Sequence, residues 1–158
     1  MEERAGRNER AEAQEAQALM MQLRQYQTQA DALTQELVLV QQSVTEYERA
    51  IETIKYLKKL KAGDELLVSV GAGASVYATL STPEKVIVSL GAGVSAEKDP
   101  DSAIESLRER KEELEKRRAE IAETLQRLEQ EAQRVQARLQ EILARQERAR
   151  QQEQARQG

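Results

Sequence analysis

Several residue types that usually carry chemistry are missing from this chain of 158 residues. It contains no Cys, no His, no Phe and no Trp, and only two Pro. Without Cys there is neither a disulfide nor a thiolate nucleophile, and without His the commonest general base and metal ligand is absent. We therefore expect no catalytic site, no metal site and no cofactor, and a role that is not enzymatic.

Long apolar runs and a strong excess of one charge are missing as well. No apolar run approaches the roughly 20 residues of a membrane span, and the opening MEERAGRNERAE has no apolar signal core. The 24 basic and 28 acidic residues leave a net charge of -4, which gives no electrostatic reason to bind nucleic acid. We expect a cytoplasmic protein that binds neither nucleic acid nor membranes.

The residues that are present favour long helices over a compact core. Only 39% are apolar and 3% aromatic, while 33% are charged, a composition typical of coiled coils when the apolar residues follow a helical period. Most glycines lie in the middle of the chain, among Val, Ser and Leu. The composition predicts a helix over residues 1–62, strands and turns over 63–98, and a second helix over 99–158.

Apolar residues recur at alternating steps of three and four in both helical segments, which is the heptad pattern of a coiled-coil seam. In the first segment they are Leu19, Leu23, Tyr26, Ala30, Leu33, Leu37, Val40, Val44, Tyr47, Ile51 and Ile54. In the second they are Ile104, Leu107, Leu114, Ile121, Leu125, Leu128, Ala132, Val135, Leu139 and Ile142, with Lys111 and Arg118 at two seam positions. We expect an antiparallel pair in which Ile54 faces Ile104 and Leu19 faces Leu139.

The ends of the helices carry their own signals. Three lysines, Lys58, Lys59 and Lys61, suit the negative last turn of the first helix, and Gly63 can adopt the left-handed conformation that would stop it. Asp99 can cap the second helix, with Pro100 in its first turn. Residues 1–15 and 144–158 have almost no apolar side chain larger than Ala, so these ends are expected to fray.

The middle segment contains an internal repeat, VSVGAGASV at residues 68–76 and VSLGAGVSA at residues 88–96. Apolar residues alternate on both sides of each Gly-Ala-Gly step, which predicts two β-hairpins with tight turns. Neither step has the third Gly and helix start of a dinucleotide-binding loop, or the Gly-Lys-Ser/Thr of a nucleoside-triphosphate loop.

Four such strands with one apolar face and two open edges cannot be stable alone. The helix roots Tyr56, Leu57 and Leu60 could cover part of that face, and the open edges should pair with another chain. We therefore predict an α+β fold, mainly α: a long antiparallel two-helix coiled coil with two β-hairpins at its base that assemble into an oligomeric β-barrel. The residues predicted to mediate assembly are Leu66, Val68, Val70, Val76, Ala78, Leu80, Val86, Val88, Leu90 and Val94.

This arrangement resembles an archaeal-type prefoldin alpha subunit. The resemblance rests on LLVSVGAG (66–73), KVIVSLGAGVSAEKD (85–99) and AIESL (103–107), and two hairpins instead of one resemble the alpha class. The resemblance implies an ATP-independent co-chaperone, a hexamer of two alpha and four beta subunits. In it the strands would form a double barrel, and the coiled-coil tips would hold non-native proteins for transfer to a group II chaperonin.

Near the predicted tips, apolar residues also occupy positions outside the seam. Flexible Met side chains there can pack against partners of different shapes. The predicted client-binding residues are Leu19, Met20, Met21, Leu23, Leu139, Ile142 and Leu143. These residues could instead only broaden the seam, and the off-seam Val38 and Leu39 favour a local or arm-to-arm contact. The alternatives to a client-holding chaperone are a structural spacer or filament subunit that stacks through its hairpins, and an adaptor for one dedicated partner.

Overall fold

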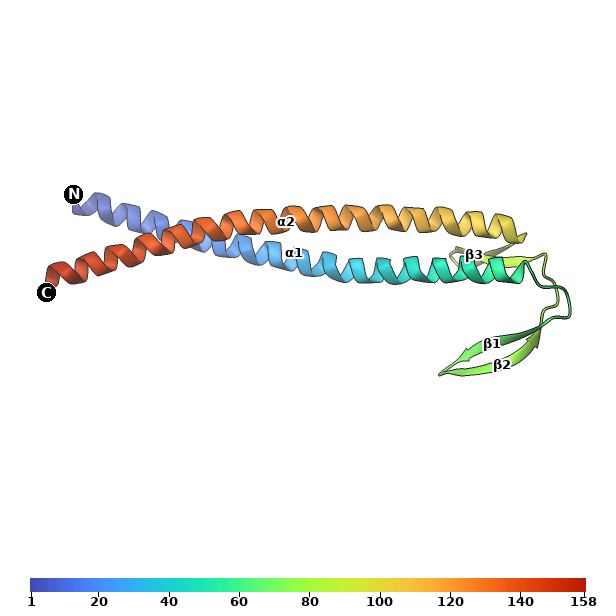
Figure 1. Cartoon of the computed structure of the whole chain (residues 1–158). Coiled ribbons are helices and arrows are strands. Elements are labelled where there is room, and N and C mark those ends of the chain that lie inside the picture. Colours follow the sequence, from blue (N-terminus) through green and yellow to red (C-terminus); the bar gives the residue numbers. More distant parts are fainter. The chain divides into compact units, whose positions relative to one another are not determined.

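The computed structural model describes all residues from 1 to 158 and contains two long helices and four strands (Figure 1). The elements in chain order are α1 (Glu2–Leu57), β1 (Glu65–Gly71), β2 (Ala74–Thr79), β3 (Val86–Gly91), β4 (Val94–Lys98) and α2 (Pro100–Gln157). The predicted combination of a helical coiled coil with two hairpins is confirmed. The chain divides into an arm unit, residues 1–38 with 119–158, and a hairpin unit, residues 39–118.

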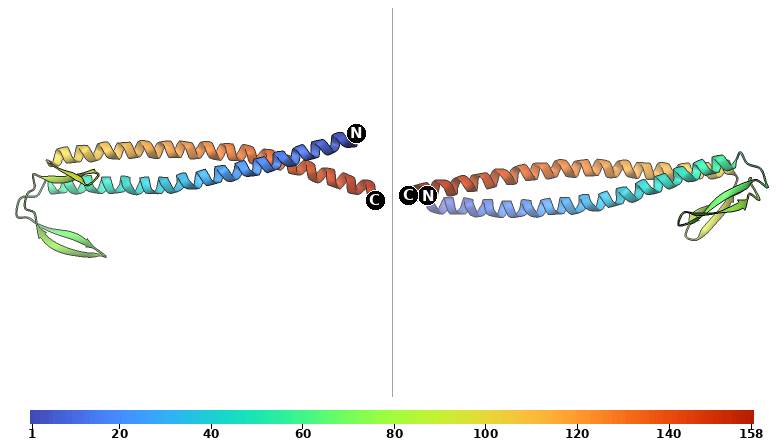
Figure 2. Two further views of the ribbon diagram at one scale, coloured as in Figure 1. Left: turned by 180° about the vertical axis from the view of Figure 1, so that it is seen from behind. Right: turned by 60° about the horizontal axis from the view of Figure 1, so that its bottom comes forward.

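In the arm unit α1 and α2 lie side by side and antiparallel, and both chain termini lie at the same end (Figure 2). The seam between them buries Ile121 and Ile142, which are 1% and 0% exposed, together with Ala16 and Val135. Ala16 extends the seam one step beyond the predicted Leu19.

Both helices continue almost to the ends of the chain, from Glu2 in α1 to Gln157 in α2. The expectation that the polar ends leave the helix is therefore not met. The physical reason lies in their composition, because Ala, Glu, Gln and Arg are strong helix formers and no Pro interrupts them. Neither helix combines the length and apolar character required to span a lipid bilayer.

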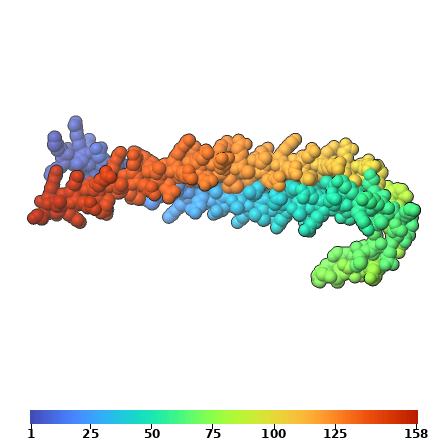
Figure 3. Space-filling model, viewed as in Figure 1, coloured from blue at the N-terminus to red at the C-terminus, as the bar shows by residue number.

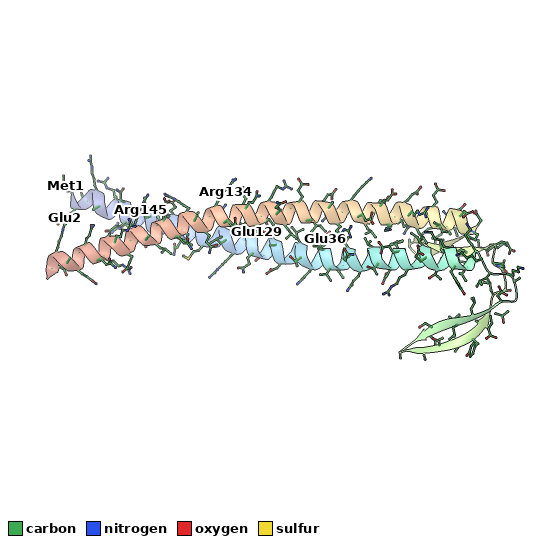
Figure 4. The ribbon with its side chains drawn as sticks, viewed as in Figure 1. Met1, Glu2, Glu36, Glu129, Arg134 and Arg145 are labelled. Atoms are coloured by element: carbon green, nitrogen blue, oxygen red, sulfur yellow. The ribbon has the colours of Figure 1, made fainter.

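Charged pairs join α1 to α2 across the seam of the arm unit. Arg138 Nε lies 2.9 Å from Glu15 Oε1, and its Nη2 donates to Glu15 Oε2 at 3.3 Å. These bonds, with a further one to Glu141, raise the pKa of Arg138. Arg145, labelled in Figure 4, pairs with Glu12 at 3.6 Å. The pairs are half exposed, so their main effect is to set register, not to add stability.

In the hairpin unit the helices share a small apolar cluster with the second hairpin. The buried members of this cluster are Ile51, Ile54, Val88, Ala103 and Ile104. The predicted approach of Ile54 to Ile104 is confirmed by their place in this one cluster. In the hairpin unit the two helices therefore pair in the register that the heptads predicted.

The two cations at seam positions reach across to α1. Lys111 Nζ lies 3.3 Å from Glu48 Oε1, and Arg118 Nη1 donates to Gln41 Oε1 at 2.9 Å. Each cation therefore has a polar partner on the facing helix, while its aliphatic stem occupies the seam.

The end of α1 differs from the prediction. The helix ends at Leu57, and Lys55 is the only basic residue in its last turn, so Lys58, Lys59 and Lys61 lie beyond it. Gly63 has a positive φ of 92°, but its N–H donates to Leu80 O at 2.8 Å. Its conformation therefore begins the first hairpin and does not stop the helix.

The start of α2 agrees with the prediction. Asp99 Oδ2 accepts a hydrogen bond from the backbone N–H of Ser102 at 3.1 Å, and its Oδ1 accepts one from the Ser102 hydroxyl at 2.6 Å. Both bonds hold the pKa of Asp99 below its usual value, the hydroxyl contributing most. Pro100 is the first residue of the helix, where its missing N–H has no cost.

Each hairpin is a separate two-stranded antiparallel sheet, β1 with β2 and β3 with β4. The four strands do not form one sheet within the chain, so the expected four-stranded unit is wrong. The two turns share one geometry: φ is positive at Gly71, Ala72 and Gly73 and likewise at residues 91–93. Positive φ at both central residues is typical of type I′ turns, whose twist matches that of the strands.

Candidate interaction surfaces

The first hairpin presents an apolar face that nothing in the chain covers. Val68 lies opposite Val76, and Leu66 lies opposite Ala78. Val68, Val70 and Val76 are 42%, 60% and 48% exposed, while Leu66, Ala78 and Leu80 are partly buried. Figure 3 shows this hairpin standing apart from the helices of its unit. All six predicted assembly residues of this hairpin are thus at least partly accessible.

The equivalent face of the second hairpin is partly buried within the chain. Val88 is only 7% exposed, because it packs in the cluster with residues of α1 and α2, and Val86 packs against the same cluster. Leu90 and Val94, nearer the turn, remain 47% and 56% exposed. Of the four assembly residues predicted here, two belong to the fold of the chain itself and two are open to a partner.

The cover over the second hairpin comes from seam residues and not from the predicted helix roots. Ile51, Ile54 and Ile104 share the buried cluster with Val88, whereas Tyr56 is 60% exposed. The expectation that the helix roots cover part of the hairpin face is therefore wrong for Tyr56, whereas Leu57 and Leu60 are half-buried but lie outside this cluster.

The opposite face of the first hairpin also carries large apolar side chains, which the sequence reasoning missed. Leu67 lies directly opposite Tyr77, and the two are 66% and 75% exposed. The equivalent place in the second hairpin pairs Ile87 with Glu97. In the sequence, Leu67 and Tyr77 are each adjacent to a residue of the predicted apolar face. Their apolar side chains break the strict alternation of apolar and polar residues, and this was the sequence signal for a second apolar face.

The predicted client-binding residues separate into two groups in the arm unit. Met20, Met21 and Leu143 are open to solvent, with 47%, 64% and 51% of their surface exposed. Leu19, Leu23 and Leu139 are half-buried in the seam, and Ile142 is fully buried. Only the first group presents a full side chain to a partner while the two helices remain paired.

The arm unit contains a hollow that is lined by residues of both α1 and α2, including Leu23. We call it the arm groove. It has a volume of about 540 Å³, and it is lined by Leu23, Tyr26, Gln27, Ala30, Leu125, Leu128, Glu129, Ala132 and Gln136. Small Ala side chains at two seam positions leave this space between the larger ones. The hydroxyl of Tyr26 accepts a hydrogen bond from Gln22 Nε2 at 2.8 Å. The paired alanines in the heptads were the sequence signal for the groove.

Two further apolar side chains of α1, Val38 and Leu39, are 53% and 64% exposed. Each keeps more than half of its surface open to solvent, so neither is enclosed by a local packing contact. The other suggestion, a contact between arms of different subunits, stays a prediction.

A family model described as Prefoldin subunit matches residues 26–145. Among curated proteins, prefoldin subunit alpha of Methanosarcina mazei is 44% identical over 107 residues, covering 66% of this chain and 75% of the relative. Prefoldin subunit alpha of Methanopyrus kandleri is 39% identical over 114 residues, covering 72% of this chain and 73% of the relative.

Solved structures show the same likeness. A cryo-EM structure of filamentous PFD from Methanocaldococcus jannaschii is similar with a TM-score of 0.65 and 26% identity, covering 74% of this chain and 97% of that one. The prefoldin beta subunit from Thermococcus strain KS-1 shares the fold, with a TM-score of 0.55 and 23% identity over 81% of this chain and 91% of that one. Together with the two helices and paired hairpins, these matches show that the chain belongs to the prefoldin family and is similar within it to the alpha subunits.

Proposed function

We propose that this chain is the alpha-type subunit of an ATP-independent cytoplasmic co-chaperone. It would assemble with beta-type subunits, two alpha with four beta, capture non-native proteins at the ends of its arms and pass them to a group II chaperonin. Membership of the prefoldin family supports a chaperone-type role, since prefoldins are chaperones and not a class of enzyme. The alpha-type relatives and the beta-subunit fold support assembly with beta-type chains.

The exposed hairpin faces support the assembly part of this proposal. An isolated two-stranded hairpin is marginal in water, and its open edges invite pairing with further strands. The first hairpin has both features, because its Val68, Val70 and Val76 are exposed and β1 pairs only with β2. Partner strands would remove this apolar surface from water and pair the free edges.

The exposed side chains of the arm unit carry the client-binding part of the proposal. Met20, Met21 and Leu143 are polarizable or flexible side chains open to solvent, a character that lets one surface fit many unlike partners. The arm groove adds a hollow that an apolar side chain of an unfolded segment can enter.

The affinity of one such surface is small, which suits a chaperone that must release its clients. Burying one Met or Leu side chain contributes about 1.5 to 3 kcal/mol, and part of that is lost in ordering an unfolded client. Several arms on one particle raise the effective concentration of binding sites, so the particle retains a client that each arm alone would lose. No ATP is needed for such a mechanism.

The test uses the complex reassembled with the beta-type subunits of the same organism. We expect the variant Met20→Gln/Met21→Gln/Leu143→Gln to suppress aggregation of a chemically unfolded client much less than the unchanged complex. The matched control is Val38→Gln/Leu39→Gln, which removes exposed apolar surface from the same helix α1. If both variants protect the client equally well, the assignment of the client surface is wrong.

Transfer is tested separately. A labelled client held by the complex should move to an added group II chaperonin, and a folded protein of similar size should not be transferred. Failure of the client to move would remove the transfer step and leave the holding activity in place.

A filament subunit is the second candidate function, because the similar cryo-EM structure is filamentous. The hairpin faces could support open-ended stacking as well as a closed particle. Native mass spectrometry and electron microscopy of the complex captured from its own cells distinguish the two. A closed particle of about six small subunits supports the co-chaperone, whereas open-ended polymers of this chain favour the filament.

A further inference from the structure

The arm groove lies on the same side of the arm as two exposed apolar side chains. On α2, Leu143, Gln136 and Glu129 follow one another at a spacing of one heptad, and on α1 Met20 and Gln27 are related in the same way. Residues one heptad apart lie on the same side of a coiled-coil helix. Because Gln27, Gln136 and Glu129 line the groove, the exposed Met20 and Leu143 lie beside it along the arm.

The lining of the groove contains a single charged side chain. Glu129, labelled in Figure 4, is exposed and forms no ion pair or hydrogen bond. Side chains three or four positions apart are neighbours on a helix, and at that spacing from Glu129 the residues of α2 are Leu125, Gln126, Ala132 and Gln133. Arg127, the nearest cation in the sequence, donates to the hydroxyl of Thr124. The groove therefore presents a carboxylate beside apolar surface, with no cation of α2 to neutralise it.

Two further charges lie on α1 next to the groove but outside its lining. Arg24 lies about one turn before Gln27, and Asp31 lies about one turn after it. Neither forms an ion pair. Since their charges have opposite signs, they offset each other, and Glu129 sets the net charge of the groove and its surroundings.

We propose that the arm groove binds segments of non-native proteins in which a Lys or Arg lies next to an apolar residue. This inference rests on the proposed function, because the occupant is a client. The apolar side chain would enter the hollow beside Leu125 and Leu128, and the neighbouring cation would pair with Glu129. Further apolar residues of the client would reach Met20 and Leu143 on the same side of the arm.

Charge complementarity selects this class of segment. Opposite charges that meet across an interface favour the partner, whereas an acidic segment would place like charges together at Glu129. The volume of about 540 Å³ lies in the range of pockets that hold small ligands, about 300 to 1,000 Å³. Because the ion pair would be exposed, the preference is modest and salt weakens it. The groove thus selects among clients without holding any of them tightly.

The test measures the binding of three labelled synthetic peptides to the complex reassembled with beta-type subunits. The peptides share one unstructured sequence that contains Leu residues, and they carry Lys, Gln or Glu at the positions next to each Leu. Fluorescence anisotropy at low salt gives the three affinities. We expect the Lys peptide to bind about fivefold more tightly than the Gln peptide, and the Glu peptide to bind most weakly. Added salt should reduce these differences.

Variants of this chain assign the preference to the groove. Glu129→Lys should weaken binding of the Lys peptide and strengthen binding of the Glu peptide, whereas Glu129→Gln should weaken the Lys peptide alone. Ala132→Leu fills part of the hollow and should weaken all three. The matched control is Glu123→Lys, because Glu123 is an exposed glutamate of α2 that has no partner and lies outside the groove. Circular dichroism checks that every variant stays helical.

Equal affinities for the three peptides, or no binding of any peptide, would overturn the inference. It would also be overturned if Glu123→Lys changed the preference as much as Glu129→Lys does. Suppression of client aggregation by the same samples tests the proposed function separately. A complex that holds clients but shows no preference among the peptides keeps the proposed function and loses the inference. A complex that prefers the Lys peptide but does not suppress aggregation keeps the groove as a binding site and loses the holding role.

Discussion

The two hairpins of the chain have nearly the same sequence and the same turn, yet they occupy different surroundings. Val68 and Val88 are equivalent residues of the repeat, but Val68 is 42% exposed and Val88 only 7%. The turns agree closely, with φ of 50° at Ala72 and 52° at Ala92. A repeat of sequence thus reproduces local geometry, while burial depends on which elements the connecting chain places nearby.

The second hairpin is fastened to α2 in two places. Lys98 Nζ donates to the Ser106 hydroxyl at 2.6 Å, and the Arg110 guanidinium donates to Leu90 O at 3.2 Å. The bonds at the root of the first hairpin stay within the connecting segment: Gly63 N–H donates to Leu80 O at 2.8 Å, and Asp64 Oδ2 accepts from the backbone N–H of Lys61 at 2.7 Å. We infer that the second hairpin is part of the folded chain, whereas the first gains its packing from partner subunits.

The largest expected effect is on the hairpin that packs within the chain. Val88→Asp buries a carboxylate in an apolar cluster and should destabilise the isolated chain by about 3 kcal/mol. Val68→Asp places the same group on an exposed face and should change stability by less than about 0.5 kcal/mol. Urea unfolding followed by circular dichroism measures both, and equal losses would remove the distinction between the hairpins.

Assembly with partner subunits should depend on the exposed face of the first hairpin, in contrast to the stability of the isolated chain. Val68→Asp/Val76→Asp puts two charges on the face that partner strands would cover, so the complex with beta-type subunits should not form. The chain itself should remain helical. Size-exclusion chromatography with native mass spectrometry measures this, with Thr79→Asp at the edge of the same hairpin as the control. A complex of normal mass would show that this face is not the one used.

Substitution of the turn glycines should have a smaller effect on stability, and it compares the two hairpins at positions with the same backbone conformation. Gly73 and Gly93 both have a φ of 75° and open space around the missing side chain, so substitution has only a conformational cost. Replacement by Ala should cost about 1 kcal/mol in a turn whose hairpin is folded. Gly93→Ala should therefore lower the stability of the isolated chain. Gly73→Ala should affect only the assembled complex, as thermal unfolding of each can show.

The smallest expected effect concerns Asp99, which joins the second hairpin to α2. Its pKa is lowered in the folded chain, so it adds stability at neutral pH. That contribution is lost as the pH falls below the ordinary value of 3.8 toward the lowered pKa. Asp99→Ala should lower the midpoint of thermal unfolding at pH 7 and make no difference at the acid end of the titration. A constant difference at all pH values would contradict the capping role.

The sequence predicted the helices and their seam well, because the heptad period reports directly on which residues face the other helix. Ile54, Ile121 and Ile142 are all buried, as the spacing indicated. The sequence signals for where a helix ends were less reliable. The lysines and Gly63 together suggested a later end to α1, but the helix ends at Leu57 where the chain turns toward the first hairpin.

The candidate surfaces could be predicted only in part. The spacing identified Met20, Met21 and Leu143 as additions to the seam, and all three are exposed. It could not show that one hairpin packs on the helices and the other does not, because both copies present the same alternation. That difference depends on contacts between residues far apart in the chain, such as Val88 with Ile51, which no local pattern records.

Lys111 and Arg118, the two cations within the seam, make the pairing of the helices selective. Each reaches one polar partner on α1, Glu48 or Gln41. A slip of one heptad would set these cations against other side chains and leave the pairs broken. Polar residues at such positions specify register and orientation at a cost in stability. A slipped pairing of the two helices therefore carries a penalty that an entirely apolar seam would not impose.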